Sequence, residues 1–417
     1  MSKPTDRSRS GNYSLGGCLF SLMRVSFSIF ILAILGFLGF DLWYRTTLKT
    51  KPLVENLRDQ WTEIGQIFGD TRKIVTITED GTVTENGKVV PLKEIANACL
   101  GNISAPAPPP EAWRSMDKGI LLNQGVATIT SLVMSPDGKT LISGGRQLQV
   151  WDLDTRKLIR TLNNYLSKED FINALALSPD GQTLASGDEK GRVILWNWKT
   201  GQIQKTLSHE GVYQLAFGSN GTLLFSGSML GSNIKQWRVQ TGQVLNTITS
   251  RVPVQKMAIS PDGQTIAVAS QGANAVEILR LSTGERVDLL IAGGQPESIA
   301  FTPNGRVLAS ASGGEQGIRL WNMIEGQPFR KLPIKVLKGH QGQPYTIAFS
   351  PDAKTLFATA DGANGKDYAL TVWNACTGEL IHRFGSQTRG HSMAISPDGK
   401  TIITGGRKGD IQMWRLP

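Results

Sequence analysis

Short apolar runs alternate with polar turn phrases over most of the chain, and this alternation is typical of β structure. One unit shows the pattern clearly: apolar runs at 174–177 and 183–186 flank a turn, and further runs follow at 192–196 and 202–207. The first two runs predict a β-hairpin. With the third and fourth runs added, each unit predicts four short strands in one small antiparallel sheet.

The turn between the first two runs has a recurrent form, Ser-Pro-Asp-Gly or a close variant. Proline presets φ at the second position, Asp or Asn suits the third, and Gly accepts the positive φ that the fourth position often needs. Successive copies lie 40–48 residues apart, a period that indicates a solenoid or a propeller. The seven copies begin at Ser135, Ser178, Gly218, Ser260, Thr302, Ser350 and Ser396.

The third strand of nearly every repeat ends in tryptophan, and repeat four has Leu279 at the matching place. A large flat side chain at one fixed strand position can fill the gap between neighbouring sheets, where its indole N–H needs a hydrogen-bond partner. The alternative, a stacking platform for a ligand, is disfavoured because these are core positions. The six residues are Trp151, Trp196, Trp237, Trp321, Trp373 and Trp414.

This pattern resembles the Trp-Asp (WD) repeat family over about residues 118–417. The Trp-Asp pair itself survives only at Trp151-Asp152. The family's buried His–Asp–Trp network finds both polar partners only in repeat six, as His340 and Asp367, so we expect repeat six alone to form it. The resemblance implies an all-β fold, a seven-bladed β-propeller of four-stranded antiparallel blades, over residues 113–417.

The seventh repeat is one strand short, because the chain ends three residues after Trp414. Residues 119–123 form an unclaimed apolar run ahead of repeat one. We therefore expect this run to supply the missing strand and close the ring, which would remove exposed sheet edges.

The first 112 residues differ in kind. A polar tail at 1–18 precedes an apolar stretch at 19–44, which we interpret as a single transmembrane helix. A cleaved secretory signal is the alternative, but no small-residue cleavage site follows Phe40. Basic residues balance across the stretch, so orientation stays open; we favour a propeller on the non-cytoplasmic side.

A small α+β segment is expected at 45–104. Apolar residues at helical spacing from Leu53 to Phe68 predict an amphipathic helix, which could pair with a copy of itself or, as we favour, pack on the next unit. Alternation between Lys73 and Leu92 predicts a small β unit. The proline-rich stretch at 105–112 predicts a stiff, extended linker to the propeller.

Most of the net charge of +10 falls on the propeller. Residues 1–112 hold 12 Lys and Arg against 11 Asp and Glu, and residues 113–417 hold 32 against 23. Ring closure would make repeats seven, one and two neighbours, and would gather five cations on one sector of one rim. This basic sector comprises Arg146, Lys190, Arg192, Arg407 and Lys408. It could dock an acidic partner, a phosphorylated group or an anionic headgroup, or it could be a solvated polar rim.

Motifs for catalysis are missing from the sequence. It has no His-Glu-x-x-His metal site, no Gly-x-Ser-x-Gly nucleophile turn and only four histidines. Three cysteines give no disulfide framework. We therefore expect no cofactor, no metal, no small-molecule substrate and no specific nucleic-acid binding.

The resemblance implies a non-enzymatic scaffold that presents loops and a rim to other proteins, here tethered to a membrane through residues 19–44. Two alternatives stay open. One is a propeller enzyme with a site at the central channel, which would need acids, histidines or asparagines gathered there. The other is a component of an envelope or secretion machine.

Overall fold

The computed structural model describes residues 75–77, 83–85, 88–89, 107–115, 120–123, 128–162, 171–270, 272–313, 317–324, 333–339, 342–361, 368–385 and 390–416. The predicted tail at 1–18, anchor at 19–44 and amphipathic helix after it lie outside these residues. Within the described residues, no helix combines the length and the apolar character needed to cross a membrane.

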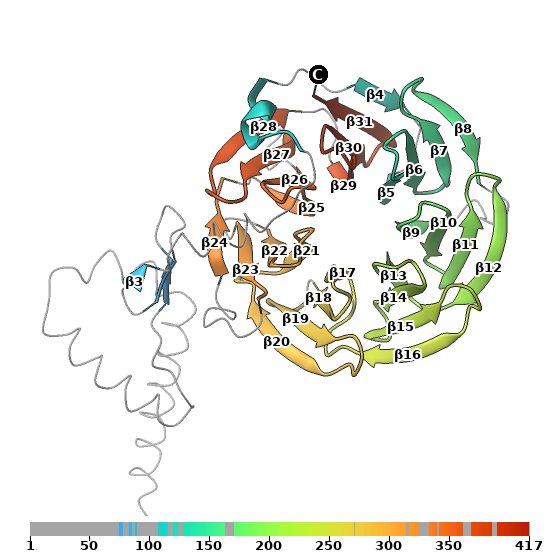
Figure 1. The fold of residues 1–417 in the computed structure, drawn as a ribbon, viewed down its shortest axis with the longest axis horizontal. Helices are drawn as coiled ribbons and strands as arrows, with labels where there is room; N and C mark the ends of the chain where they lie inside the picture. Colours follow the sequence, from blue (N-terminus) through green and yellow to red (C-terminus); the bar gives the residue numbers. More distant parts are fainter. Residues whose placement is uncertain are drawn as a thin grey trace, which may run out of the picture. The chain divides into compact units, whose positions relative to one another are not determined.

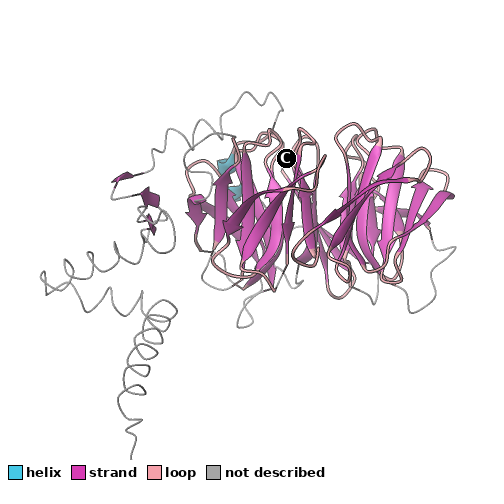
Figure 2. Ribbon diagram, turned by 90° about the horizontal axis from the view of Figure 1, so that it is seen from below, coloured by secondary structure: helices cyan, strands magenta, loops and turns pink. Residues whose placement is uncertain are grey.

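Seven antiparallel sheets of four strands each form the predicted propeller, arranged as blades around a ring (Figure 1). The strands of each blade run roughly side by side through the thickness of the ring, so connections emerge alternately on its two faces (Figure 2). Turns between first and second strands share one face with those between third and fourth. Loops between second and third strands share the other face with the connections between blades. We number the blades as the repeats.

Each blade contributes its strands in order from the centre of the ring outward (Figure 1). The innermost strands are β5 (Ser131–Met134), β9 (Ile172–Leu177), β13 (Val212–Phe217), β17 (Lys256–Ile259), β21 (Pro296–Phe301), β25 (Gln343–Phe349) and β29 (Gly390–Ile395). The second strands are β6 (Thr140–Gly144), β10 (Thr183–Asp188), β14 (Leu223–Ser228), β18 (Thr265–Ala269), β22 (Val307–Ser312), β26 (Thr355–Asp361) and β30 (Thr401–Gly406).

The third and outermost strands complete the blades. The third strands are β7 (Gln149–Asp152), β11 (Arg192–Asn197), β15 (Asn233–Arg238), β19 (Ala275–Arg280), β23 (Ile318–Asn322), β27 (Tyr368–Asn374) and β31 (Asp410–Arg415). The outermost strands are β8 (Lys157–Thr161), β12 (Gln202–Ser208), β16 (Val244–Thr249), β20 (Arg286–Ile291), β24 (Pro333–Leu337), β28 (Leu380–Gly385) and β4 (Ile120–Asn123).

Ring closure occurs as predicted, because β4 is the outermost strand of blade 7. It pairs antiparallel with β31, with Asn123 opposite Asp410 and Leu122 opposite Ile411. The first propeller strand in the chain thus completes the last blade, and blade 7 becomes the neighbour of blade 1. A side-chain bond from Ser392 Oγ to the Ile129 carbonyl, 3.2 Å long, crosses that junction.

The recurrent turn phrases form closed turns at the predicted places. In blade 1 the Gly138 N–H donates to the Ser135 carbonyl at 2.9 Å, and Gly138 has a φ of 70°. Asp137 Oδ1 accepts from Ser135 Oγ and from the Lys139 N–H at 3.0 Å. The Ser135 hydroxyl, followed by the Lys139 N–H, lowers the pKa of the Asp137 carboxyl. The serine, the aspartate and the glycine of the phrase therefore each have a separate physical role.

Tryptophan fills the gaps between blades, and its indole N–H finds a hydroxyl on the neighbouring second strand in most of them. Trp321, for example, is fully buried and donates to Ser310 Oγ at 2.9 Å. The other pairs are Trp151 with Ser143, Trp196 with Ser186, Trp237 with Ser226 and Trp414 with Thr404. The six tryptophans are buried core residues, in agreement with the predicted role.

The stretch just before the propeller docks on it. Residues 110–115 form a 3-10 helix, η2 (Pro110–Ser115), rather than continuing an extended linker. Trp113 is 1 % exposed, packs edge-on against Phe357 at 5.2 Å between ring centroids, and joins the core cluster that includes Trp414. Arg114 forms an ion pair with Glu379. The propeller unit therefore includes this tryptophan.

Farther toward the N-terminus, the alternating pattern between Lys73 and Leu92 gives three short strands. They are β1 (Val75–Ile77), β2 (Val83–Glu85) and β3 (Lys88–Val89). They pair antiparallel in the order β1-β2-β3, as expected for a small β meander.

Candidate docking surface

Hydrogen bonds join the loops that carry the predicted cations of blades 7 and 1. Residues 128–130 run between them. Thr128 Oγ1 donates to the Arg407 carbonyl at 3.0 Å, and the Ile129 N–H donates to the Gly406 carbonyl at 3.0 Å. Farther along, the Thr130 N–H donates to the Gly144 carbonyl at 2.9 Å. Arg407 and Arg146 are therefore held on the same face by one connecting segment.

Phe171 links the loop of blade 1 to that of blade 2. The Arg146 guanidinium carbon lies 4.8 Å from the centre of the Phe171 ring, a cation–π distance. The Glu189 N–H donates to the Phe171 carbonyl at 3.2 Å, and Lys190 is the next residue. Arg146 and Lys190 are both exposed. The three loops of blades 7, 1 and 2 thus lie side by side, as the sequence predicted.

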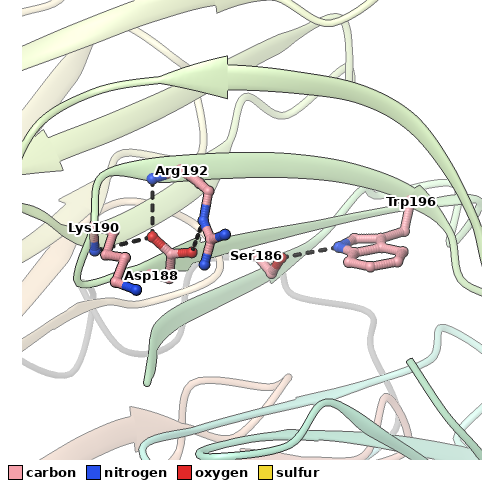
Figure 3. A network of polar contacts seen from close by, with 5 residues as sticks. All are labelled: Ser186, Asp188, Lys190, Arg192 and Trp196. Atoms are coloured by element: carbon pink, nitrogen blue, oxygen red, sulfur yellow. Dashed lines mark hydrogen bonds and ion pairs between the residues drawn. The ribbon is translucent and has the colours of Figure 1, made fainter. Parts of the chain in front are cut away.

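Arg192 differs from the other four members of the basic sector, because it holds its own loop together (Figure 3). Asp188, 1 % exposed, accepts from the Lys190 N–H at 3.0 Å, the Arg192 N–H at 2.9 Å and Arg192 Nε at 2.6 Å. A buried carboxylate needs such compensation. Arg192 therefore neutralises the buried Asp188 carboxylate, in addition to the docking role predicted for it.

Arg407 lies against an aromatic pair on two innermost strands. Its Nε donates to His391 Nε2 at 2.6 Å, and its Nη2 donates to the Tyr345 hydroxyl at 2.7 Å. The Tyr345 and His391 rings stack with centroids 4.1 Å apart and planes 20° apart. The guanidinium carbon also lies 5.6 Å from the Tyr345 ring centre. Because His391 Nε2 accepts here, its imidazole is neutral, with the proton on Nδ1.

The sequence pattern did not identify this cluster. Tyr345 stands five residues before Ser350, and His391 stands five residues before Ser396. Both lie where the pairing of first and second strands shifts register in their blades. This shared position, five residues before the turn serine, is the sequence signal that could have identified the pair. It marks equivalent places on neighbouring blades, close to the face that carries the basic sector.

The acids expected of a channel enzyme do not gather among the described residues. Glu297 is 6 % exposed and accepts from Gln343 Nε2 at 2.6 Å. Burial lowers the pKa of the Lys256 ammonium, and Glu297 partly offsets this. In the part of the chain that the structure describes, no three His, Cys, Asp or Glu side chains form a cluster that could hold a metal ion.

The histidine network appears in blade 3, so the expectation that repeat six alone could form it is wrong. His209 is 3 % exposed; its Nδ1 contacts Ser226 Oγ at 2.6 Å, and its Nε2 contacts Asn233 Oδ1. Ser226 also accepts from Trp237. Asn233 stands four residues before Trp237, whereas Asp367 stands six residues before Trp373, so the two positions do not correspond in the sequence. His340 and Asp367 lie outside the described residues.

The architecture defines the class of protein: a seven-bladed propeller of four-stranded blades, in which the first propeller strand in the chain, β4, completes the last blade. The chain belongs to the WD40 family. The sequence model of the WD domain, G-beta repeat, matches residues 122–152, 156–197, 201–238, 293–322, 331–374 and 378–415, more than half of the chain. No curated protein gives a significant match.

The family matches also reflect the ring closure. The match at 156–197 begins with β8, the outermost strand of blade 1, and continues through the three inner strands of blade 2. A repeat in sequence therefore spans two blades in space. Residues 239–292, which include all four strands of blade 4, are not matched. This is the blade in which Leu279 replaces tryptophan.

Proposed function

We propose that this protein is a non-enzymatic, membrane-tethered scaffold that docks an acidic partner protein on its basic sector. WD40 propellers generally mediate protein–protein interactions, and membership of that family supports the scaffold role. The observation that carries the docking surface is the joining of three loops into one face. Arg146, Lys190, Arg407 and Lys408 are all exposed there.

Charge and shape favour a protein partner over a merely solvated rim. Two of these cations are held by aromatic neighbours: Arg146 lies on Phe171, and Arg407 lies against Tyr345 and His391. Arginine and tyrosine are enriched at the energetic centres of protein interfaces. Glu189 is the exposed acid of the β10–β11 loop, next to Lys190, so the surface is not uniformly basic.

The test is charge reversal with a matched control. Arg146→Glu, Lys190→Glu and Arg407→Glu together should abolish capture of a defined partner by the tagged full-length chain. The control reverses Lys139, Lys199 and Lys400, which are exposed, belong to the same three blades and lie in turns on the opposite face. Unchanged capture by the first variant, or equal loss in both, would rule out the basic sector as the docking surface.

The membrane tether rests on the apolar stretch at 19–44. We place the propeller on the non-cytoplasmic side, and protease treatment of intact cells or spheroplasts carrying a tag after Pro417 tests this. Loss of the tag once the envelope is opened, with the inner membrane intact, is expected. Protection under that condition would put the propeller in the cytoplasm, and a tag that fractionates without membranes would exclude the anchor.

A further inference from the structure

Blade 3 exposes three large apolar side chains at one end of its two inner strands. Leu230 and Met229 follow β14 and are 72 % and 36 % exposed, and Tyr213, near the start of β13, is 41 % exposed. Val212 pairs with Ser228, the last residue of β14, and the register of the two strands shifts directly after this pair. The three exposed residues therefore lie at the same end of the same strand pair, and we call them the apolar patch. Apolar side chains that gather on a surface mark interaction sites, whereas single ones are ordinary.

Hydrogen bonds hold the loop of the apolar patch to the connection between β12 and β13. The Met229 N–H donates to the Gly211 carbonyl at 2.9 Å, and Ser228 Oγ donates to the Glu210 carbonyl at 2.8 Å. Gly211 has a φ of 67°, and a Cβ there would lie 2.7 Å from Leu230 Cγ. Glycine therefore lets the Leu230 side chain pack directly on the backbone of this connection.

The same connection joins the apolar patch to the basic sector. The His209 N–H donates to the Gly191 carbonyl at 2.8 Å, and Lys190 precedes Gly191 in the β10–β11 loop. On the innermost strands, Asn173 Nδ2 donates to the Val212 carbonyl at 3.2 Å. Blade 3 stands next to blade 2 in the ring (Figure 1). The apolar patch therefore continues the face that carries the cations of blades 7, 1 and 2.

We propose that the apolar patch and the basic sector act as one docking surface, and that the acidic partner segment carries a large apolar side chain that packs on the patch. This proposal rests on the proposed function and specifies the partner further. Methionine adapts to differently shaped apolar groups, and tyrosine offers a large rigid ring. Removal of apolar area from water strengthens binding, whereas the charges steer the segment and set its register. The patch would thus select among acidic segments that the cations alone would all attract.

A protein segment fits this surface better than an anionic membrane or a second copy of the chain. Glu189, next to Lys190, and Glu210, in the connection under the apolar patch, are both exposed. An anionic bilayer is negative over its whole surface and would press charge against both carboxylates. A segment can instead place its acids on the cations and its apolar side chain on the patch. A second copy in a two-fold contact would bring the basic sectors together, and like charges repel.

The experiment measures binding of two fluorescein-labelled peptides to the purified full-length protein by fluorescence anisotropy. One is an oligoglutamate with a single central leucine, and the other has serine in place of that leucine. The leucine peptide should bind about tenfold more tightly, a difference of about 1.4 kcal/mol. Leu230→Ser should reduce this preference to less than about twofold and leave the affinity for the serine peptide unchanged. Leu230→Met, which keeps an apolar side chain, should keep the preference.

The matched control removes an exposed apolar side chain elsewhere. Ile159 is 51 % exposed and lies on β8, the outermost strand of blade 1. Ile159→Ser should leave both affinities as they are in the parent. Reversal of Arg146, Lys190 and Arg407 to Glu should weaken binding of both peptides, because both carry the same acids. Thermal unfolding of each variant checks that the propeller is intact.

Failure of the apolar patch and failure of the basic sector give different results. Equal affinity of the parent for the two peptides, or a leucine preference that survives Leu230→Ser, would overturn the patch; the proposed function would stand if charge reversal still weakened binding. Binding that charge reversal leaves unchanged, or no binding of either peptide, would overturn both. Binding to phosphatidylglycerol vesicles that falls in Leu230→Ser, with neither peptide bound, would show that the surface reads lipid and would also contradict the proposal.

Discussion

Replacement of Ser310 by alanine tests the role of the buried hydroxyls between blades. Ser310 lies on β22 and is 0 % exposed. Its Oγ accepts from Trp321 Nε1 at 2.9 Å, and Trp321 is also 0 % exposed. Alanine removes the acceptor without creating space for a water molecule, so the indole N–H is left buried and unpaired.

The magnitude follows from the desolvation of that N–H group. A buried donor that loses its partner costs about 1–3 kcal/mol of unfolding free energy. The same strand provides a matched control, because Ser312 lies two residues farther along and is 1 % exposed. Among the residues that the structure describes, its Oγ has no hydrogen-bond partner. Ser312→Ala therefore removes an unsatisfied hydroxyl and should leave stability unchanged or raise it by up to about 1 kcal/mol.

Urea unfolding followed by far-ultraviolet circular dichroism measures both variants, compared at their midpoints once the slopes are shown to agree. Ser310→Ala should unfold at lower urea than the parent, and Ser312→Ala should not. Trp321→Phe removes the donor, so Ser310→Ala should cost about 1 kcal/mol less in that background than in the parent. Equal losses for the two serine variants, or no coupling with Trp321, would refute the hydrogen-bond explanation.

Three further predictions concern single buried groups. Burial lowers the pKa of His209 in the folded protein, so on acidification the imidazole is protonated in the unfolded chain before it is protonated in the folded one. The free energy of unfolding should therefore fall as pH drops below about 6.5. His209→Gln should flatten this part of a pH series of urea melts. Trp113→Ala should cost about 3–5 kcal/mol and make residues near η2 sensitive to protease, whereas unchanged stability would contradict its packing on Phe357. Asp188→Ala should lower the unfolding free energy, measured in the same urea melts, by about 2–3 kcal/mol. Asp188→Asn should lower it by less, because an amide oxygen can still accept from the Lys190 and Arg192 N–H groups. Equal losses for the two variants would contradict this account.

Local patterns made the blades predictable. The turn beginning at Ser135 needs only residues within five positions of it: the serine, the aspartate and the glycine each bond inside the turn. Ring closure was predictable for a different reason. Repeat seven lacked a strand, and the apolar run at 119–123 had no other place in the pattern. The order of the strands alone therefore predicts that the loops of Arg407 and Arg146 are neighbours.

The details of the surface could not be predicted, because they depend on contacts between blades. Tyr345 and His391 carry no repeat signature, and their stacking depends on the spacing between β25 and β29. The pairing of Arg192 with Asp188 was equally hidden, since the sequence shows two charges four residues apart but not that the carboxylate is buried. Trp113 stands after a proline-rich stretch, where composition favours a linker and says nothing about docking on Phe357.

The two blades that depart from the tryptophan–hydroxyl pattern support the same physical rule. In blade 4 the position on the second strand that elsewhere carries serine or threonine is Val268, which cannot accept a hydrogen bond, and the third strand carries Leu279, which has no N–H to satisfy. In blade 6 that position is Ala358, yet Trp373 is retained and buried. Its Nε1 donates instead to the Lys338 carbonyl at 3.1 Å. Blade 6 keeps the indole and has another acceptor for it, whereas blade 4 has neither the hydroxyl nor the indole. This is expected if an unpaired buried N–H costs more than the additional packing that tryptophan provides over leucine can offset.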